Sequence, residues 1–342
     1  MTARRIVAVL AAIVLIGGAL LVRNAIDDDG AEADGPNGSI VPGTSPDAGR
    51  DAAALICSTE VAAACEAIGA AHPELAVSVE PAGRTLDRLG ALPEGTEPPV
   101  WLTVAPFPEM AESLRTAGGL DPLGGTADAL AASPLVAATP TGGRAEALAA
   151  GCAGTPLWRC VGDHASGPWT DIGGDESWRT LRPSLGVVET DATALGSFAA
   201  AVAGYLGSPS VSRSAWESDP SFIPWLRRLA GAVSPTALSA GTPLATMATR
   251  AGALDIAATS EAARIGLGAR SDAFDASYPE PSMWLEAVLA VPDGITIPDD
   301  VPGLAAAALQ EAGWDDAATA TQSLPGASTM LALRTLWQEA TT

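Results

Sequence analysis

Short apolar runs alternate with longer amphipathic segments along most of the chain after residue 51. Apolar runs bounded by Gly and Pro predict buried strands, whereas apolar residues that recur with a helical period predict helices. Strands are predicted at 53–57, 75–83, 98–106, 133–142, the first part of 184–207, 253–260 and 284–294. Helices are predicted at 58–72, 84–90, 108–118, the second part of 184–207, 222–233, 242–252, 303–314 and 328–340. This alternation predicts an α/β architecture with mainly parallel sheets.

The N-terminal segment has a different pattern. Arg4 and Arg5 precede an unbroken apolar run over 6–22, which as a helix would extend about 26 Å, marginally enough to cross a bilayer core. Basic residues before such a run keep the N-terminus in the cytoplasm. Residues 1–25 therefore predict an uncleaved single-pass anchor in the cell membrane, with a cleaved signal peptide as the alternative. Residues 26–50, rich in Gly, Pro, Asp and Ser, predict a flexible tether that carries an extracellular globular part.

Composition narrows the function classes. The chain has 342 residues, enough for a core divided over two lobes, and its hydrophobic content of 48% excludes a disordered protein. The net charge is −22, and all 18 basic residues are Arg because the sequence contains no Lys. A chain this acidic, without a basic patch, is not expected to bind nucleic acid.

The four cysteines all follow the apolar run and fit an oxidising compartment. Cys152 and Cys160 bracket a turn-rich loop, and a disulfide between them is predicted. The sequence does not decide whether Cys57 and Cys65 are bonded to each other. If a helix begins near Thr59, their Cα atoms would lie about 11–12 Å apart, too far for a disulfide. Either that helix starts later, or these two cysteines are not paired with each other.

Catalytic chemistry is not evident in the sequence. The two histidines, His72 and His164, do not stand at metal-ligand spacing from a cysteine or from each other. There is no G-x-S-x-G motif to supply a nucleophile, and a phosphate-binding loop that needs Lys is excluded. The prediction is a protein that is not an enzyme, with no metal and no cofactor.

Hydroxyl and carboxyl side chains gather where predicted strands pass into helices. In open α/β sheets ligands bind at the carboxyl ends of strands, where helix N-termini converge. The candidate ligand-binding residues are Ser58, Thr59, Thr85, Thr103, Ser133, Thr190, Asp191, Thr193 and Thr259. Helix capping is the alternative role for each such residue, and Asp191 in particular either caps its helix or selects a ligand that carries donors.

Six segments resemble, in order and spacing, the bacterial extracellular solute-binding proteins of the type II periplasmic-binding class: 55–83, 98–106, 129–142, 169–174, 182–207 and 253–263. The nearest resemblance is to binding domains linked to von Willebrand A domains, without that further domain. The resemblance implies two α/β lobes joined by a hinge. Lobe one would comprise 51–135 and 275–342, and lobe two 136–274, with crossings near Ser133-Pro134 and near Ala276-Tyr278.

Two functions follow from this resemblance. The first is capture of a small molecule between the lobes for uptake or sensing, with a membrane transporter or another membrane protein as partner. The second is a binding-protein fold reused as an extracellular scaffold or sensor that binds a protein partner. Polar joins at strand ends favour capture, and a permanent tether favours the scaffold.

Overall fold

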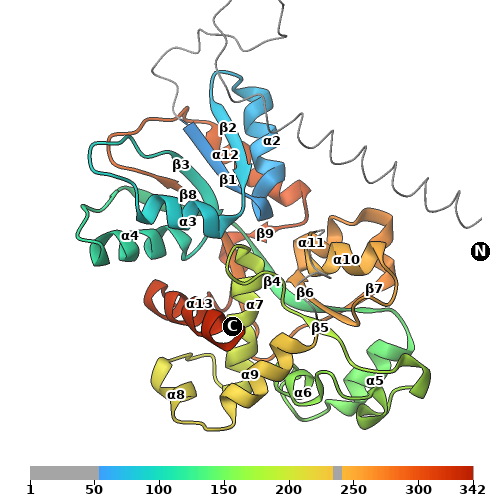
Figure 1. The fold of residues 1–342 in the computed structure, drawn as a ribbon. Coiled ribbons are helices and arrows are strands. Elements are labelled where there is room, and N and C mark those ends of the chain that lie inside the picture. Colours follow the sequence, from blue (N-terminus) through green and yellow to red (C-terminus); the bar gives the residue numbers. More distant parts are fainter. Residues whose placement is uncertain (1–53, 234–240, 342) are drawn as a thin grey trace, which may run out of the picture. The chain divides into compact units, whose positions relative to one another are not determined.

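A computed structural model describes residues 54–233 and 241–341. The predicted anchor and tether, 1–25 and 26–50, lie outside the described residues. None of the helices in the described ranges combines the length and apolarity that crossing a bilayer requires. Figure 1 shows the arrangement of the elements.

The strands form one connected set of pairings. In order they run β2-β1-β3-β8-β4-β6-β5, and β7 and β9 also pair with β4. Their bounds are β1 (Ala54–Ser58), β2 (Ala76–Glu80), β3 (Val100–Val104), β4 (Thr126–Pro140), β5 (Pro183–Ser184), β6 (Ile256–Ser260), β7 (Phe274–Ser277), β8 (Trp284–Val291) and β9 (Asp315–Asp316).

The helices alternate with these strands. The α-helices are α2 (Ala62–Ala71), α3 (Ala82–Gly90), α4 (Phe107–Ala117), α5 (Gly143–Gly151), α6 (Leu157–His164), α7 (Ala192–Leu206), α8 (Arg213–Glu217), α9 (Phe222–Gly231), α10 (Pro243–Thr249), α11 (Glu261–Ile265), α12 (Val301–Glu311) and α13 (Ala327–Thr341). Short 3₁₀ turns are η1 (Thr59–Val61), η2 (Trp169–Ile172), η3 (Glu176–Trp178), η5 (Gly268–Ala273) and η6 (Ala317–Thr319).

The expectation of mainly parallel sheets is wrong, because the sheet is mixed. β1 pairs in parallel with β2 and β3, and β5 pairs in parallel with β6. β8, in contrast, runs antiparallel to both β3 and β4, and β4 runs antiparallel to β6 and β7. The departure comes from β8, a strand late in the chain that inserts between β3 and β4 in the opposite direction, and from β4, whose 15 residues pair with β8 along one part and with β6 and β7 along the other.

β4 joins two groups of strands. Its first half, up to Pro134, pairs with β8 and so connects to β3, β1 and β2. Its second half, from Leu135, pairs with β6 and β7. We call these the first and second strand groups. Figure 1 shows α2, α3, α4 and α12 around the first group and α5, α10 and α11 beside the second.

The C-terminal helix α13 contacts helices that lie before and after β4 in the chain. It packs against α4 and also against α7 and α9. Trp337 on α13 meets the ring of Phe198 on α7 edge-on, with 5.1 Å between the ring centroids. The lobe boundaries suggested by the sequence stay a prediction, and so do the chain crossings near Ser133-Pro134 and near Ala276-Tyr278.

Both cysteine pairs form disulfides. Cys152 and Cys160 are bonded, as predicted, with 5.6 Å between their Cα atoms. Cys57 is bonded to Cys65 with 6.1 Å between the Cα atoms, which settles the alternatives in favour of a late helix. The chain turns back through η1 after the strand, so that α2 begins only at Ala62 and its first turns lie beside β1.

The strand predicted in the first part of 184–207 is nearly absent. Only Pro183 and Ser184 pair with β6. Gly186 has a φ of 99°, a left-handed conformation that ends the extended backbone, and a Cβ at this position would lie 3.0 Å from the Cβ of Ala194 in the helix that follows. Thr190 and Asp191 then donate their backbone N–H groups to the carbonyl of Val187, which forms the turn into α7.

Candidate functional site

A cavity of about 450 Å³ lies between the ends of the two strand groups. One wall comes from the turn after β1 and from the end of α12, and the other comes from α7, α10, β6 and α11. Its lining residues are Thr59, Glu60, Ala62, Leu185, Asp191, Thr193, Ala194, Thr242, Pro243, Ala258, Thr259, Ser260, Ala262, Ala263, Gly266, Ala312 and Trp314. The cavity thus opens at the carboxyl ends of β1 and β6, where open α/β sheets bind ligands.

Four of the nine sequence candidates line this cavity. They are Thr59, Asp191, Thr193 and Thr259. Whether they contact a ligand stays a prediction. Among the described residues, no side chain or backbone group forms a hydrogen bond with the Thr193 hydroxyl, which leaves it able to meet a ligand.

The other five candidates do not line this cavity. Ser58 and Thr103 are fully buried, and their hydroxyl oxygens lie 2.6 Å apart, so each satisfies the other. Thr85 is fully buried on α3. The carbonyl of Thr190 accepts from the backbone N–H of Gly83 at 2.9 Å.

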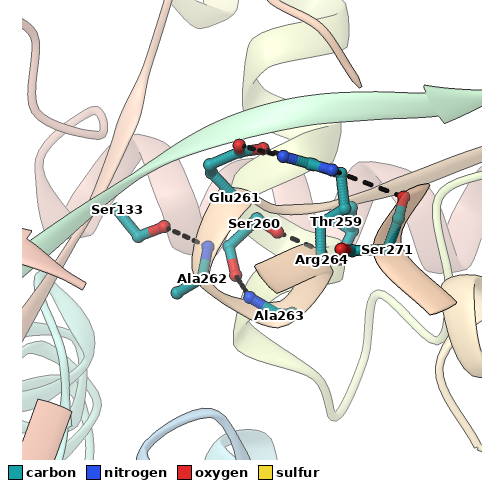
Figure 2. Close-up of polar contacts among 8 residues, drawn as sticks. All are labelled: Ser133, Thr259, Ser260, Glu261, Ala262, Ala263, Arg264 and Ser271. Carbon is teal, nitrogen blue, oxygen red and sulfur yellow. Dashed lines mark hydrogen bonds and ion pairs between the residues drawn. The ribbon is translucent and has the colours of Figure 1, made fainter. Parts of the chain in front are cut away.

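Ser133 and Ser260 act on the first turn of α11, as Figure 2 shows. The Ser133 hydroxyl accepts from the backbone N–H of Ala262 at 2.9 Å, and the Ser260 hydroxyl accepts from that of Ala263 at 3.1 Å. Within the same turn, the Arg264 guanidinium donates to both carboxylate oxygens of Glu261. The hydroxyls at this join therefore satisfy helix donors, which is the capping role.

Asp191 is the N-cap of α7. Its backbone is extended, and its carboxylate accepts from the backbone N–H of Ala194 at 2.7 Å. Of the two roles considered for Asp191, the structure shows the cap. The N-terminus of a helix carries a partial positive charge, so an acid at this position is also favoured electrostatically.

Glu60 is the residue that sequence reasoning missed. Its Oε1 atom accepts from the backbone N–H groups of Ala192 at 2.7 Å and of Thr193 at 3.3 Å. Glu60 lies on η1, 132 residues before Ala192, and no local motif announces a partner that distant. An acid directly after the Ser58-Thr59 pair at a strand end is the only signal the sequence offers.

Two acids thus share the end of α7 that faces the cavity. Burial raises the pKa of Asp191 to about 7, and the nearby charge of Glu60 adds to the shift. Burial also raises the pKa of Glu60, against the lowering effect of the backbone N–H groups that it accepts from. Both carboxyl groups are therefore held where a negative charge is costly.

No metal-binding cluster accompanies them. Within residues 54–233 and 241–341, no three His, Cys, Asp or Glu side chains gather in a way that could hold a metal ion.

Comparison with known proteins supports the fold. No protein-family model and no curated protein matches the chain. Among solved structures, a ferric binding protein from Campylobacter jejuni superposes with a TM-score of 0.55 at 9% identity, covering 84% of this chain and 98% of that one. The periplasmic binding protein AfuA from Actinobacillus pleuropneumoniae gives 0.51 at 12% identity, covering 85% and 98%. Apo FutA2 from Synechocystis PCC6803 gives 0.50 at 14% identity, also covering 85% and 98%.

These likenesses define the class of fold. The chain has the two-lobed α/β fold of periplasmic solute-binding proteins of the type II class, which confirms the expectation from the sequence. At such low identity the likeness concerns the fold alone, so the function has to be argued from the residues of this chain.

Proposed function

We propose that this protein captures a small molecule in the cavity between its two strand groups, on the outer side of the cell membrane, for uptake or sensing. The observation that carries the proposal is the cavity at the carboxyl ends of β1 and β6. Its volume of about 450 Å³ falls within the usual range for small-molecule sites. Segments far apart in the sequence contribute to its walls, as expected of a site formed between lobes.

The cavity walls combine apolar and polar groups in the manner of small-molecule sites. Leu185, Pro243 and the indole of Trp314 supply apolar surface, and the hydroxyls of Thr193 and Thr259 supply groups that can fix a ligand's orientation. Of the neighbours named above, one is a ferric binding protein and AfuA was solved with fructose-6-phosphate bound. Because these ligands differ, the ligand of this chain has to be inferred from its own cavity.

The cellular setting is part of the same proposal. The apolar run over 6–22 after Arg4 and Arg5 anchors the protein, and 26–50 tethers it. A membrane transporter, or another membrane protein, receives the captured molecule or the signal. N-terminal sequencing of the mature protein tests the anchor: a start near residue 1 supports it, and a start beyond residue 25 contradicts it.

A thermal-shift screen tests ligand capture. The purified full chain is melted in the presence of sugars, amino acids, short peptides, organic amines and inorganic anions. We expect at least one class to raise the melting temperature, because a ligand that binds only the folded state stabilises it by mass action. A screen without any hit would contradict capture and favour the alternative of a scaffold that binds a protein partner.

A further inference from the structure

The N-terminus of α7 already holds an acidic group of the protein itself. The Glu60 carboxylate lies 2.7 Å from the backbone nitrogen of Ala192 and 3.3 Å from that of Thr193. Helix α7 has 15 residues, so its first N–H groups and its dipole attract an oxyanion. Glu60 therefore stands where the oxyanion of a ligand would otherwise bind.

The third backbone N–H group at the N-terminus of α7 also has an acceptor within the protein. The first three N–H groups of α7 belong to Ala192, Thr193 and Ala194, and the last of these donates to Asp191 at 2.7 Å. Together Glu60 and Asp191 accept from all three. A ligand anion entering the cavity would find these helix donors occupied.

The described side chains that line the cavity supply no positive charge that would attract an anion in place of these helix donors. Among the described residues that line the cavity there is no Arg and no His, and the sequence contains no Lys. Glu60 and Asp191 are the acids on its walls. An anionic ligand would thus meet two carboxyl groups and no compensating cation, which disfavours it in a partly desolvated site.

We propose that Glu60 determines specificity: by occupying the N-terminus of α7 it excludes ligands with an oxyanion at that end and selects ligands that present hydrogen-bond donors there. The inference rests on the proposed function, since it concerns the same cavity. A ligand with an amine or hydroxyl group would donate to the Glu60 carboxylate, whose Oε2 atom accepts from the exposed Thr59 hydroxyl at 3.3 Å.

The test uses inorganic sulfate as probe and the full chain at pH 7.5. The double variant Glu60→Ala/Asp191→Asn removes both charges and keeps a capping side chain, since Asn is as good an N-cap as Asp. The matched control is Glu66→Ala/Asp191→Asn, which has the same net charge but keeps Glu60. Glu66 lies exposed on α2, away from the cavity lining. Sulfate affinity is measured by isothermal titration calorimetry.

We expect the Glu60 double variant to bind sulfate at least tenfold more tightly than the wild type, and the control to match the wild type within a factor of about three. Equal sulfate affinity in the wild type and the Glu60 double variant would overturn the inference. If that variant does not fold, Glu60→Ser/Asp191→Asn replaces it with the same expected gain, because Ser removes the charge and is too short to occupy the N-terminus of α7.

This experiment separates the inference from the proposed function. If no compound of the thermal-shift screen binds the wild type and the Glu60 double variant still gains sulfate, capture fails and the role of Glu60 stands. If the wild type binds oxyanions in the cavity, capture stands and the role of Glu60 is refuted.

Discussion

The backbone of α3 at Gly83 lies close to the backbone just before α7, and replacing Gly83 tests this close approach. Gly83 lies on α3 and donates its backbone N–H to the carbonyl of Thr190, just before α7. A Cβ at this position would lie 2.7 Å from the Cα of Thr190 and would overlap the carbonyl of Glu189. Arg334 contacts the same segment before α7, because its guanidinium donates to the Glu189 carbonyl at 3.0 Å.

The effect of Gly83→Ala is the difference of two terms. Alanine in a helix gains about 0.5–1 kcal/mol over glycine. Against this, relieving the overlap requires the 189–190 backbone to move by about 1 Å, and overpacking of this kind costs about 1–3 kcal/mol. We therefore expect the free energy of unfolding to fall, by up to about 2.5 kcal/mol.

Gly303→Ala is the matched control. Gly303 also lies in a helix, α12, and a Cβ there would meet nothing within 4 Å, so only the helical gain applies. Urea unfolding of the full chain, followed by tryptophan fluorescence, measures both variants. If Gly83→Ala stabilises the protein as much as Gly303→Ala, the close approach of α3 to the start of α7 is refuted.

Two further predictions concern buried charge. The pKa of Asp191, raised to about 7, means that the folded protein holds a proton the unfolded chain has released, so stability falls as pH rises from about 4 to 7. The free energy of unfolding of Asp191→Asn should therefore exceed that of the wild type by about 1–2 kcal/mol at pH 8 and equal it at pH 4. Urea titrations measure both, and the same difference at the two pH values would refute this prediction. Arg115, only 3% exposed, donates to the carbonyls of Leu89, Leu92 and Asp121. In the same assay, Arg115→Ala should lower the free energy of unfolding by about 2–4 kcal/mol. The control Arg84→Ala, at an exposed position of α3, should lower it by less than about 0.5 kcal/mol. Equal losses in the two variants would contradict the structural role of Arg115.

Elements with a strong local pattern could be predicted from the sequence. The apolar run at 98–106 contains β3, Val100–Val104, in which every residue is buried. The helix predicted at 303–314 overlaps α12, whose start is marked by a proline in its first turn. In these segments periodicity and termination signals agree, so tertiary contacts do not override them.

Features that depend on distant partners could not be predicted in this way. The antiparallel course of β4 and β8 is set by pairing between segments such as Ala127 and Ala290, which no local pattern encodes. The strand expected near 184–190 failed because Gly186 adopts a left-handed conformation in its context, although the apolar run around it is typical of a strand.

The candidate site, like the fold, could be predicted from the sequence only in part. Thr59, Asp191, Thr193 and Thr259 line the cavity because polar residues at strand ends converge in open α/β sheets, and their contact with a ligand stays a prediction. Ser133, another candidate, does not line it, and its hydroxyl accepts from the backbone of Ala262. A cap and a ligand contact require the same residue types, so only the position of the side chain separates them.

The central claim is that a small molecule binds in the cavity between the strand groups. Isothermal titration calorimetry of the strongest hit from the thermal-shift screen tests it most directly. We compare the wild type with Thr193→Ala, Thr259→Ala and the control Thr116→Ala, which alters an exposed position on α4 outside the cavity lining.

The account predicts that affinity falls about tenfold or more in at least one of the two cavity variants, as expected when a hydrogen bond to the ligand is lost, and is unchanged in Thr116→Ala. Equal affinity in all four proteins would contradict binding in this cavity.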